Sequence, residues 1–298
     1  MNFIFFVLFS IIASFSYADT VQPTQGPTVI LVDKKTNTLQ LTHFEGPDLK
    51  VDESFHATLG QVIGDKETEG DLKTPEGIYL IKQRLTPPHL KPKFGSMAFY
   101  LDYPNAFDQI AGRTGFDIML HATNEPERLK KNYDSLGCVV VNNDEIQRIY
   151  PKIRVGMTPV LIYSELTADY LTPSKTGVAS QLEAFFKGWI RSWESKNIDD
   201  YMASYHPDFS AQGKNRDQWK QYKKSLNSKY ADIIVGPDHV YYYRHPKYSV
   251  ITFTQNYHSN FPGGRRAFTS RGTKILYVAE QSGQPKIISE NFTNLLWE

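Results

Sequence analysis

The sequence predicts two domains of different fold class, a mostly β domain followed by an α+β domain. Before residue 120 no helical periodicity of any length appears, and short apolar or alternating segments are separated by prolines and polar loops. After residue 179 a strongly amphipathic helix opens a run of helices, and alternating segments follow to the end of the chain. A chain of 298 residues is long enough for two hydrophobic cores.

Apolar or alternating stretches in the first half predict β-strands joined by turns. Asn142 and Glu145 have the spacing of a capping box, which predicts a short helix that ends at Pro151. The expected strands are residues 28–32, 38–44, 50–60, 78–83, 115–122, 137–141 and 158–165.

The second half begins after a polar stretch with Pro and Gly, residues 166–178, which we interpret as a linker. The next helix carries one continuous apolar stripe, formed by Leu182, Phe185, Phe186, Trp189, Ile190 and Trp193. Two more amphipathic helices are expected within residues 199–209 and 215–230, and strands from Ile233 onward. Domain boundaries of 27–165 and 179–298 follow. Trp189, Trp193, Tyr201 and Tyr205 are expected to pack in the second core rather than line a pocket.

The first 18 residues are almost wholly apolar and predict a secretory signal peptide. Ser16 and Ala18 are small residues with the separation that signal peptidase needs for cleavage before Asp19. The segment contains no Lys or Arg, so an uncleaved anchor is the alternative. No other stretch approaches the length of a membrane span, so no transmembrane segment is expected after cleavage. The prediction is an exported protein of the periplasm or cell envelope.

Charge and motif content exclude several classes of function. Lys and Arg number 33 against 32 Asp and Glu, and this balance argues against nucleic acid as a partner. The eight His residues lack the paired spacing of metal ligands, so no metal is expected. No P-loop or GxGxxG motif is present, and no cofactor is predicted.

The single cysteine, Cys138, is the candidate nucleophile. His121 ends one apolar strand and Cys138 begins the next, so paired strands would bring base and thiol to one end of a sheet. The carbonyl of Ala122 could accept a hydrogen bond from the imidazole, and an imidazolium nearby would lower the pKa of the thiol. The N–H groups of Gly137 and Cys138 could form an oxyanion hole. The alternative is a structural role for all of these residues, with Cys138 as an inert buried side chain.

The motif "SLGCVVV", with "IMLHA" upstream, resembles the signature of the YkuD L,D-transpeptidase family, and the resemblance covers residues 27–165. It implies a β-sandwich with short helices, in which Cys138 is the nucleophile, His121 the base and Ala122 the orienting carbonyl. Ser135 belongs to the same motif and is a candidate substrate contact. Arg113, in "AGRTG", is a candidate for binding a substrate carboxylate. Leu136 replaces the usual histidine of the motif, and Val140 stands where many members have arginine.

The resemblance implies peptidoglycan stem peptides as substrate. Cys138 would attack the bond between the diamino acid and D-Ala, and the resulting thioester would pass to water or to an amine. Water gives an L,D-carboxypeptidase, and an amine gives an L,D-transpeptidase that forms 3–3 cross-links. Attachment or removal of a wall-linked protein is a further alternative, and a non-catalytic wall-binding module is another.

The segment from residue 183 to 210 resembles the first helices of the nuclear-transport-factor-like, or SnoaL-like, cone fold. A YkuD-type domain followed by such a cone resembles the cell-shape L,D-carboxypeptidases of curved and helical bacteria, which favours hydrolysis. A glycan or peptide is a possible ligand of the second domain. Arg265, Arg266 and Arg271 lie on an expected hairpin that could hold an anionic group, although a solvated basic loop explains them more simply.

Overall fold

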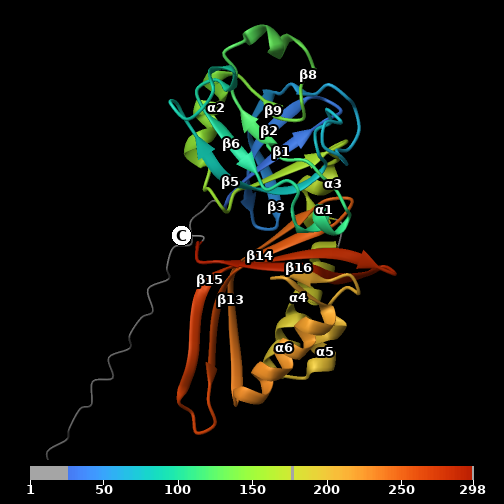
Figure 1. Cartoon of the computed structure of the whole chain (residues 1–298), viewed down its shortest axis with the longest axis vertical. Helices are drawn as coiled ribbons and strands as arrows, with labels where there is room; N and C mark the ends of the chain where they lie inside the picture. Colours follow the sequence, from blue (N-terminus) through green and yellow to red (C-terminus); the bar gives the residue numbers. More distant parts are fainter. Residues whose placement is uncertain (1–25, 176–177, 297–298) are drawn as a thin grey trace, which may run out of the picture.

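The computed structural model describes residues 26–175 and 178–296, so the expected signal peptide at residues 1–18 lies outside the described part. Figure 1 shows two domains stacked along the long axis, with the last strands and the two longest helices in the lower one. Within the described residues, no helix combines the length and the apolarity needed to cross a bilayer. The predicted order of fold classes, mostly β and then α+β, is confirmed.

The N-terminal domain is built on an eight-stranded sheet with strand order β3-β2-β1-β10-β5-β6-β7-β9. Its strands are β1 (Thr28–Asp33), β2 (Thr38–Glu45), β3 (Asp48–His56), β5 (Gly77–Leu85), β6 (Ala98–Leu101), β7 (Met119–His121), β9 (Val139–Val140) and β10 (Pro159–Tyr163). A small parallel pair joins β4 (Leu59–Gly60) and β8 (Tyr133–Ser135). The short helices are α1 (Ala106–Ile110) and α2 (Asn143–Ile149), with 3-10 turns η1 (Pro92–Phe94), η2 (Pro126–Lys130) and η3 (Tyr150–Lys152).

The capping box predicted for α2 is present. The Asn142 side chain accepts a hydrogen bond from the N–H of Glu145 at 2.7 Å, and the Glu145 carboxylate accepts one from the N–H of Asn142 at 2.9 Å. These two bonds satisfy backbone donors that a helix start otherwise leaves open. The helix begins directly after β9, so its cap also fixes the chain that follows Cys138.

Strand β1 is apolar on both faces because both faces are covered. Ile30 and Val32 pack into the interior of the N-terminal domain. Val29 and Leu31 point the opposite way and pack with Tyr277 and other residues of the C-terminal sheet. A strand with two buried faces has the continuous apolar sequence seen here, in contrast to the alternation of a half-exposed strand.

The C-terminal domain packs helices against one face of a four-stranded antiparallel sheet. The helices are α4 (Val178–Glu194), α5 (Ile198–Ala203) and α6 (Arg216–Lys229), and the sheet contains β13 (Asp232–Arg244), β14 (Ser249–Asn260), β15 (Arg266–Gln281) and β16 (Gln284–Thr293). A short hairpin joins β11 (Ser210–Ala211) to β12 (Lys214–Asn215). The four aromatic residues expected in this core, Trp189, Trp193, Tyr201 and Tyr205, are all buried.

The segment that we interpreted as a linker, residues 166–178, contains short helices. Here α3 (Ala168–Leu171) is followed by the 3-10 turn η4 (Pro173–Lys175). The side chain of Asp48 accepts hydrogen bonds from the N–H of Ser174 at 3.0 Å and from its hydroxyl at 2.7 Å. The connection therefore lies against the N-terminal domain at this point.

The turn between β13 and β14 attaches the C-terminal domain to the N-terminal sheet. The hydroxyl of Tyr248 accepts hydrogen bonds from the N–H of Ile78 and from the Asn105 amide, each at 2.7 Å. Lys247 pairs with Asp65 and also donates to the carbonyl of Glu76 at 2.7 Å. The two domains are therefore joined by these hydrogen bonds and by the apolar cluster that β1 shares with the C-terminal sheet.

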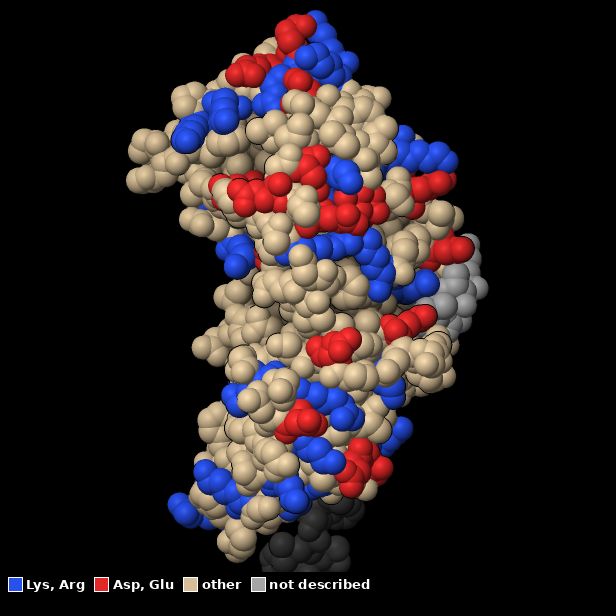
Figure 2. Space-filling view, turned by 45° about the vertical axis from the view of Figure 1, so that its right-hand side comes forward, with Lys and Arg blue, Asp and Glu red and all other residues tan. Residues whose placement is uncertain are grey.

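The charged side chains on the face shown in Figure 2 are mixed in sign. Lys and Arg alternate with Asp and Glu over both domains, and neither sign covers this face. A broad basic surface of the kind that follows a nucleic-acid backbone is not visible there.

Candidate active site

Strands β7 and β9 bring His121 and Cys138 to the same face of the sheet. They pair in parallel, with Leu120 opposite Val139 and His121 opposite Val140. Cys138 immediately precedes β9, so it lies two positions from the residue opposite His121 and shares its face. Both side chains line one cleft of about 530 Å³.

The imidazole of His121 is held as a neutral base. Its Nδ1 lies 2.5 Å from the carbonyl oxygen of Ala122, an arrangement in which Nδ1–H donates and Nε2 keeps its lone pair. Phe94 packs edge-on against the ring, with centroids 4.9 Å apart. Burial lowers the pKa of His121 to about 4, because the charged form would lose its hydration. Arg128 and Lys93 lower this pKa further, against the effect of the Ala122 carbonyl.

The thiol of Cys138 is also neutral in this structure. Its Sγ lies 3.6 Å from the carbonyl oxygen of Asp117, to which the thiol donates. Burial raises the pKa of Cys138 to about 11, although the N–H of Met119 and the charge of Arg128 act in the opposite direction. Both shifts have the same physical cause, and burial in this cleft favours the uncharged imidazole and thiol over an imidazolium–thiolate pair.

Gly137 has a conformational role. Its φ is +128°, and a Cβ at this position would lie 2.8 Å from the carbonyl oxygen of Lys73. Its N–H donates to the Ser135 hydroxyl at 3.1 Å. In this structure an internal acceptor therefore occupies this N–H, and its contribution to an oxyanion hole stays a prediction. The N–H of Cys138 itself donates to no acceptor within the described ranges 26–175 and 178–296.

Ser135 supports the turn that carries the thiol. Its hydroxyl donates to the carbonyl of Cys138 at 2.7 Å while it accepts from Gly137, and the side chain is buried. The hydroxyl proton is therefore used in a hydrogen bond within the protein. These bonds give Ser135 a positioning role for the backbone on either side of Gly137, and a contact with substrate stays a prediction.

Arg113 does not line the cleft. Its guanidinium pairs with Asp65 at 2.5 Å and with Asp108 at 3.5 Å, and it donates to the carbonyl of Lys66 at 3.3 Å. Two internal carboxylates pair with this cation, which favours a structural role, and carboxylate binding by Arg113 stays a prediction. Asp65 also pairs with Lys247, so Arg113 belongs to an ion network that extends to the C-terminal domain.

Four cationic residues that were not identified from sequence line the cleft, namely Lys66, Lys91, Lys93 and Arg128. Arg128, on η2, donates to the carbonyl of Asp134 at 2.9 Å and pairs with its carboxylate at 3.5 Å, and Lys93 lies beside Phe94. Both line the cleft with Cys138. The signal in the sequence is the polar stretch between His121 and Cys138, which contains Arg128.

Two large apolar side chains are exposed at the same cleft. Leu136 is 66% exposed and Phe116 is 63% exposed. They provide an apolar rim beside the basic residues, so the cleft suits a ligand with both anionic and aliphatic parts. In the described part of the chain, no group of three or more His, Cys, Asp or Glu residues could hold a metal ion.

Comparison with known proteins identifies both domains. Residues 27–162 match the YkuD family, described as the L,D-transpeptidase catalytic domain, and residues 181–291 match the Cds6 C-terminal NTF2-like domain. Among curated proteins, YafK of Escherichia coli K12, named as a candidate L,D-transpeptidase, is 28% identical over 126 residues. That match covers 42% of this chain and 46% of YafK, so the chain spans about half the length of the curated relatives it matches.

Two solved structures extend the likeness over both domains. Bd1075 of Bdellovibrio bacteriovorus is 31% identical, with a TM-score of 0.76 over 92% of this chain and 95% of its own. Pgp2 of Campylobacter jejuni, a helical cell shape determining protein, is 25% identical, with a TM-score of 0.65 over 90% of this chain and 93% of its own. The chain therefore belongs to the L,D-transpeptidase family with a YkuD catalytic domain, in the form that carries a C-terminal NTF2-like domain.

Proposed function

We propose that this protein is a peptidoglycan-modifying cysteine enzyme that acts as an L,D-carboxypeptidase and shortens tetrapeptide stems to tripeptides. The observation that carries the proposal is the shared cleft of His121 and Cys138, with the imidazole tautomer fixed by Ala122. Similarity to Pgp2, a helical cell shape determining protein, supports a role of the same class for this chain.

The first half of the reaction forms a thioester. The thiol leaves the Asp117 carbonyl, and Nε2 of His121 takes its proton as Sγ attacks the carbonyl carbon of the diamino acid. The N–H of Cys138 is the donor that remains for the oxyanion, since Gly137 bonds to Ser135. Collapse of the tetrahedral intermediate breaks the peptide bond. The leaving amine of D-Ala takes the proton from His121.

The second half releases the tripeptide. Water attacks the thioester carbonyl, and Nε2 of His121 again takes the proton. Collapse breaks the carbon–sulfur bond, and the thiolate recovers the proton from the imidazolium. The products are a tripeptide carboxylate and a free thiol. The basic residues Lys93 and Arg128 would attract the carboxylates of the stem, and Leu136 and Phe116 would contact its aliphatic parts.

Digestion of purified tetrapeptide muropeptides tests this assignment. We expect tripeptide and an equal amount of free D-Ala, measured by liquid chromatography and mass spectrometry. Accumulation of 3–3 dimers would instead identify a transpeptidase, which is the second candidate. Release of a protein from a stem-linked conjugate, with no D-Ala from the tetrapeptide, would identify the third candidate, an enzyme that removes wall-linked proteins. No product from any of these substrates would favour a non-catalytic wall-binding module.

The neutral resting pair predicts a broad pH plateau. Since the pKa of His121 is lowered to about 4, its base form is present above that pH and lost as pH falls through it. Since the thiol pKa is raised to about 11, no alkaline limb from Cys138 is expected near neutrality. We therefore expect kcat/KM for D-Ala release to stay level through neutral pH. A loss of activity centred near the ordinary imidazole pKa of about 6.5 would contradict this.

The substrate requires that the protein act outside the cytoplasmic membrane, and we propose export to the cell envelope. The apolar segment at residues 1–18 supports export. Fractionation of cells that produce the full chain tests it. The expected result is a periplasmic protein that begins at Asp19, and recovery of the intact chain from the cytoplasm would contradict the proposal.

A further inference from the structure

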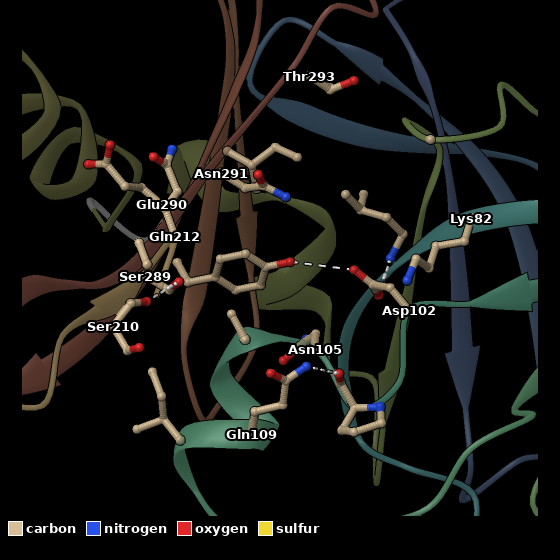
Figure 3. Close-up of a pocket in the computed structure, with 18 of the residues that line it drawn as sticks. Lys82, Asp102, Asn105, Gln109, Ser210, Gln212, Ser289, Glu290, Asn291 and Thr293 are labelled. Carbon is tan, nitrogen blue, oxygen red and sulfur yellow. Dashed lines mark hydrogen bonds between the residues drawn. The ribbon is translucent and has the colours of Figure 1, made fainter. Parts of the chain in front are cut away.

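A second cavity lies between the two domains and is separate from the Cys138 cleft. It has a volume of about 910 Å³ and shares no lining residue with that cleft. Strand β5 and the segment from Asp102 to Ile110 form one side, while the β11–β12 turn and strands β15 and β16 form the other (Figure 3). Because both domains contribute, neither would form this cavity alone.

Several polar groups in the cavity have no partner in the protein. The Lys82 ammonium, the Gln212 amide and Nδ2 of Asn291 make no hydrogen bond within the described residues. Figure 3 shows Lys82 beside Asp102 on one side, with Gln212 and Asn291 across the cavity. Gln109 uses its Nε2 to donate to the carbonyl of Pro104 at 2.8 Å, and its Oε1 is left as an acceptor. Donors and acceptors therefore face the same space from both domains.

The charges of this cavity nearly balance. Asp102 accepts from the N–H of Leu80 at 2.8 Å and from the Tyr277 hydroxyl at 3.5 Å, and Lys82 is the cation close to it. Glu290 is engaged elsewhere, by Lys274 and by the Tyr205 hydroxyl. A polyanion would need several cations, which this cavity does not offer.

The ligand that matches this lining is neutral and rich in hydroxyl and amide groups. Sugar hydroxyls both donate and accept, as the unpaired amide and ammonium groups require, and an acetamido group pairs with side-chain amides. Leu80, Ile110 and Ile275 lie among the polar groups and offer apolar surface to the C–H faces of a sugar ring. The volume falls in the range of ligand sites, which is about 300–1,000 Å³.

We propose that this cavity between the domains binds a short N-acetylated oligosaccharide, the glycan of the polymer whose stem peptides the catalytic domain cleaves. This identification of the glycan rests on the proposed function. Both domains would contact a glycan bound here, so binding would also reduce their relative motion. The cleft at Cys138 would remain free for the peptide.

Titration of the full protein with N,N′,N″,N‴-tetraacetylchitotetraose by calorimetry tests the proposal. We expect binding by the wild type and equal binding by Cys138→Ala, which lacks the nucleophile. Lys82→Ala combined with Gln212→Ala should weaken binding at least about tenfold, since two ligand hydrogen bonds are lost. The matched control, Lys50→Ala combined with Gln221→Ala, removes an exposed lysine and an exposed glutamine outside the cavity and should bind as the wild type does.

Three outcomes would overturn the proposal. The first is no binding of the oligosaccharide by the wild type, and the second is equal binding by the wild type and the cavity double variant. The third is binding of the free tetrapeptide, and not of the sugar, that the cavity double variant weakens. This result would make the cavity a peptide site. Failure of the proposed function is distinguishable, because it appears as absence of D-Ala release and leaves sugar binding unaffected.

Discussion

Replacement of Cys138 by Ala is expected to abolish release of D-Ala from tetrapeptide muropeptides. The only thiol of the chain is lost, so no thioester can form and the reaction must proceed without covalent catalysis. Loss of a nucleophile in comparable acyl-transfer enzymes lowers kcat by roughly 10⁴-fold or more. The measurement is D-Ala production by purified wild type and variant at saturating substrate.

A matched variant separates loss of chemistry from loss of fold. Ser135→Ala removes the hydroxyl that bonds to the Cys138 carbonyl and leaves the thiol in place, so it should reduce activity far less than Cys138→Ala does. Both variants should keep the circular dichroism spectrum of the wild type. If Cys138→Ala releases D-Ala at the wild-type rate, the thiol is not the nucleophile and the covalent mechanism proposed above is wrong.

Replacement of His121 by Gln is expected to lower the rate of acylation by about 10²–10⁴-fold, the usual contribution of a general base. Gln keeps an amide that can donate to the Ala122 carbonyl, but it offers no nitrogen that can take the thiol proton. Because the thiol pKa is raised to about 11, very little thiolate exists at neutral pH without the base.

The pH dependence of this variant gives a second, independent readout. Without the base, the rate should depend on the small thiolate fraction and increase about tenfold for each pH unit up to the thiol pKa. The wild type should lack that increase in the neutral range. A level profile in His121→Gln, at the rate of the wild type, would show that another group takes the proton.

Local patterns in the sequence were sufficient to predict the elements that carry the site. The strand before His121, the strand after Cys138 and the capped helix after Asn142 all appear where apolar runs and the capping spacing indicate them. These features depend on neighbours within a few residues, and their signals are therefore visible in the chain itself.

The partners of polar side chains could not be predicted in the same way. Arg113 bonds to Asp65, 48 positions earlier, and Gly137 donates to a hydroxyl whose rotamer depends on the folded turn. The uncharged state of His121 and Cys138 follows from burial, which is a property of the assembled sheet. Motif spacing identifies which residues meet, whereas the fold determines which of their donors remain free.

The most direct test of the central claim is intact-protein mass spectrometry after incubation with a carbapenem, whose strained β-lactam ring can acylate an activated thiol. The account predicts one covalent adduct on Cys138 of the wild type, no adduct on Cys138→Ala, and much slower adduct formation on His121→Gln. An adduct that forms on His121→Gln at the rate of the wild type, or one that forms on Cys138→Ala, would contradict it.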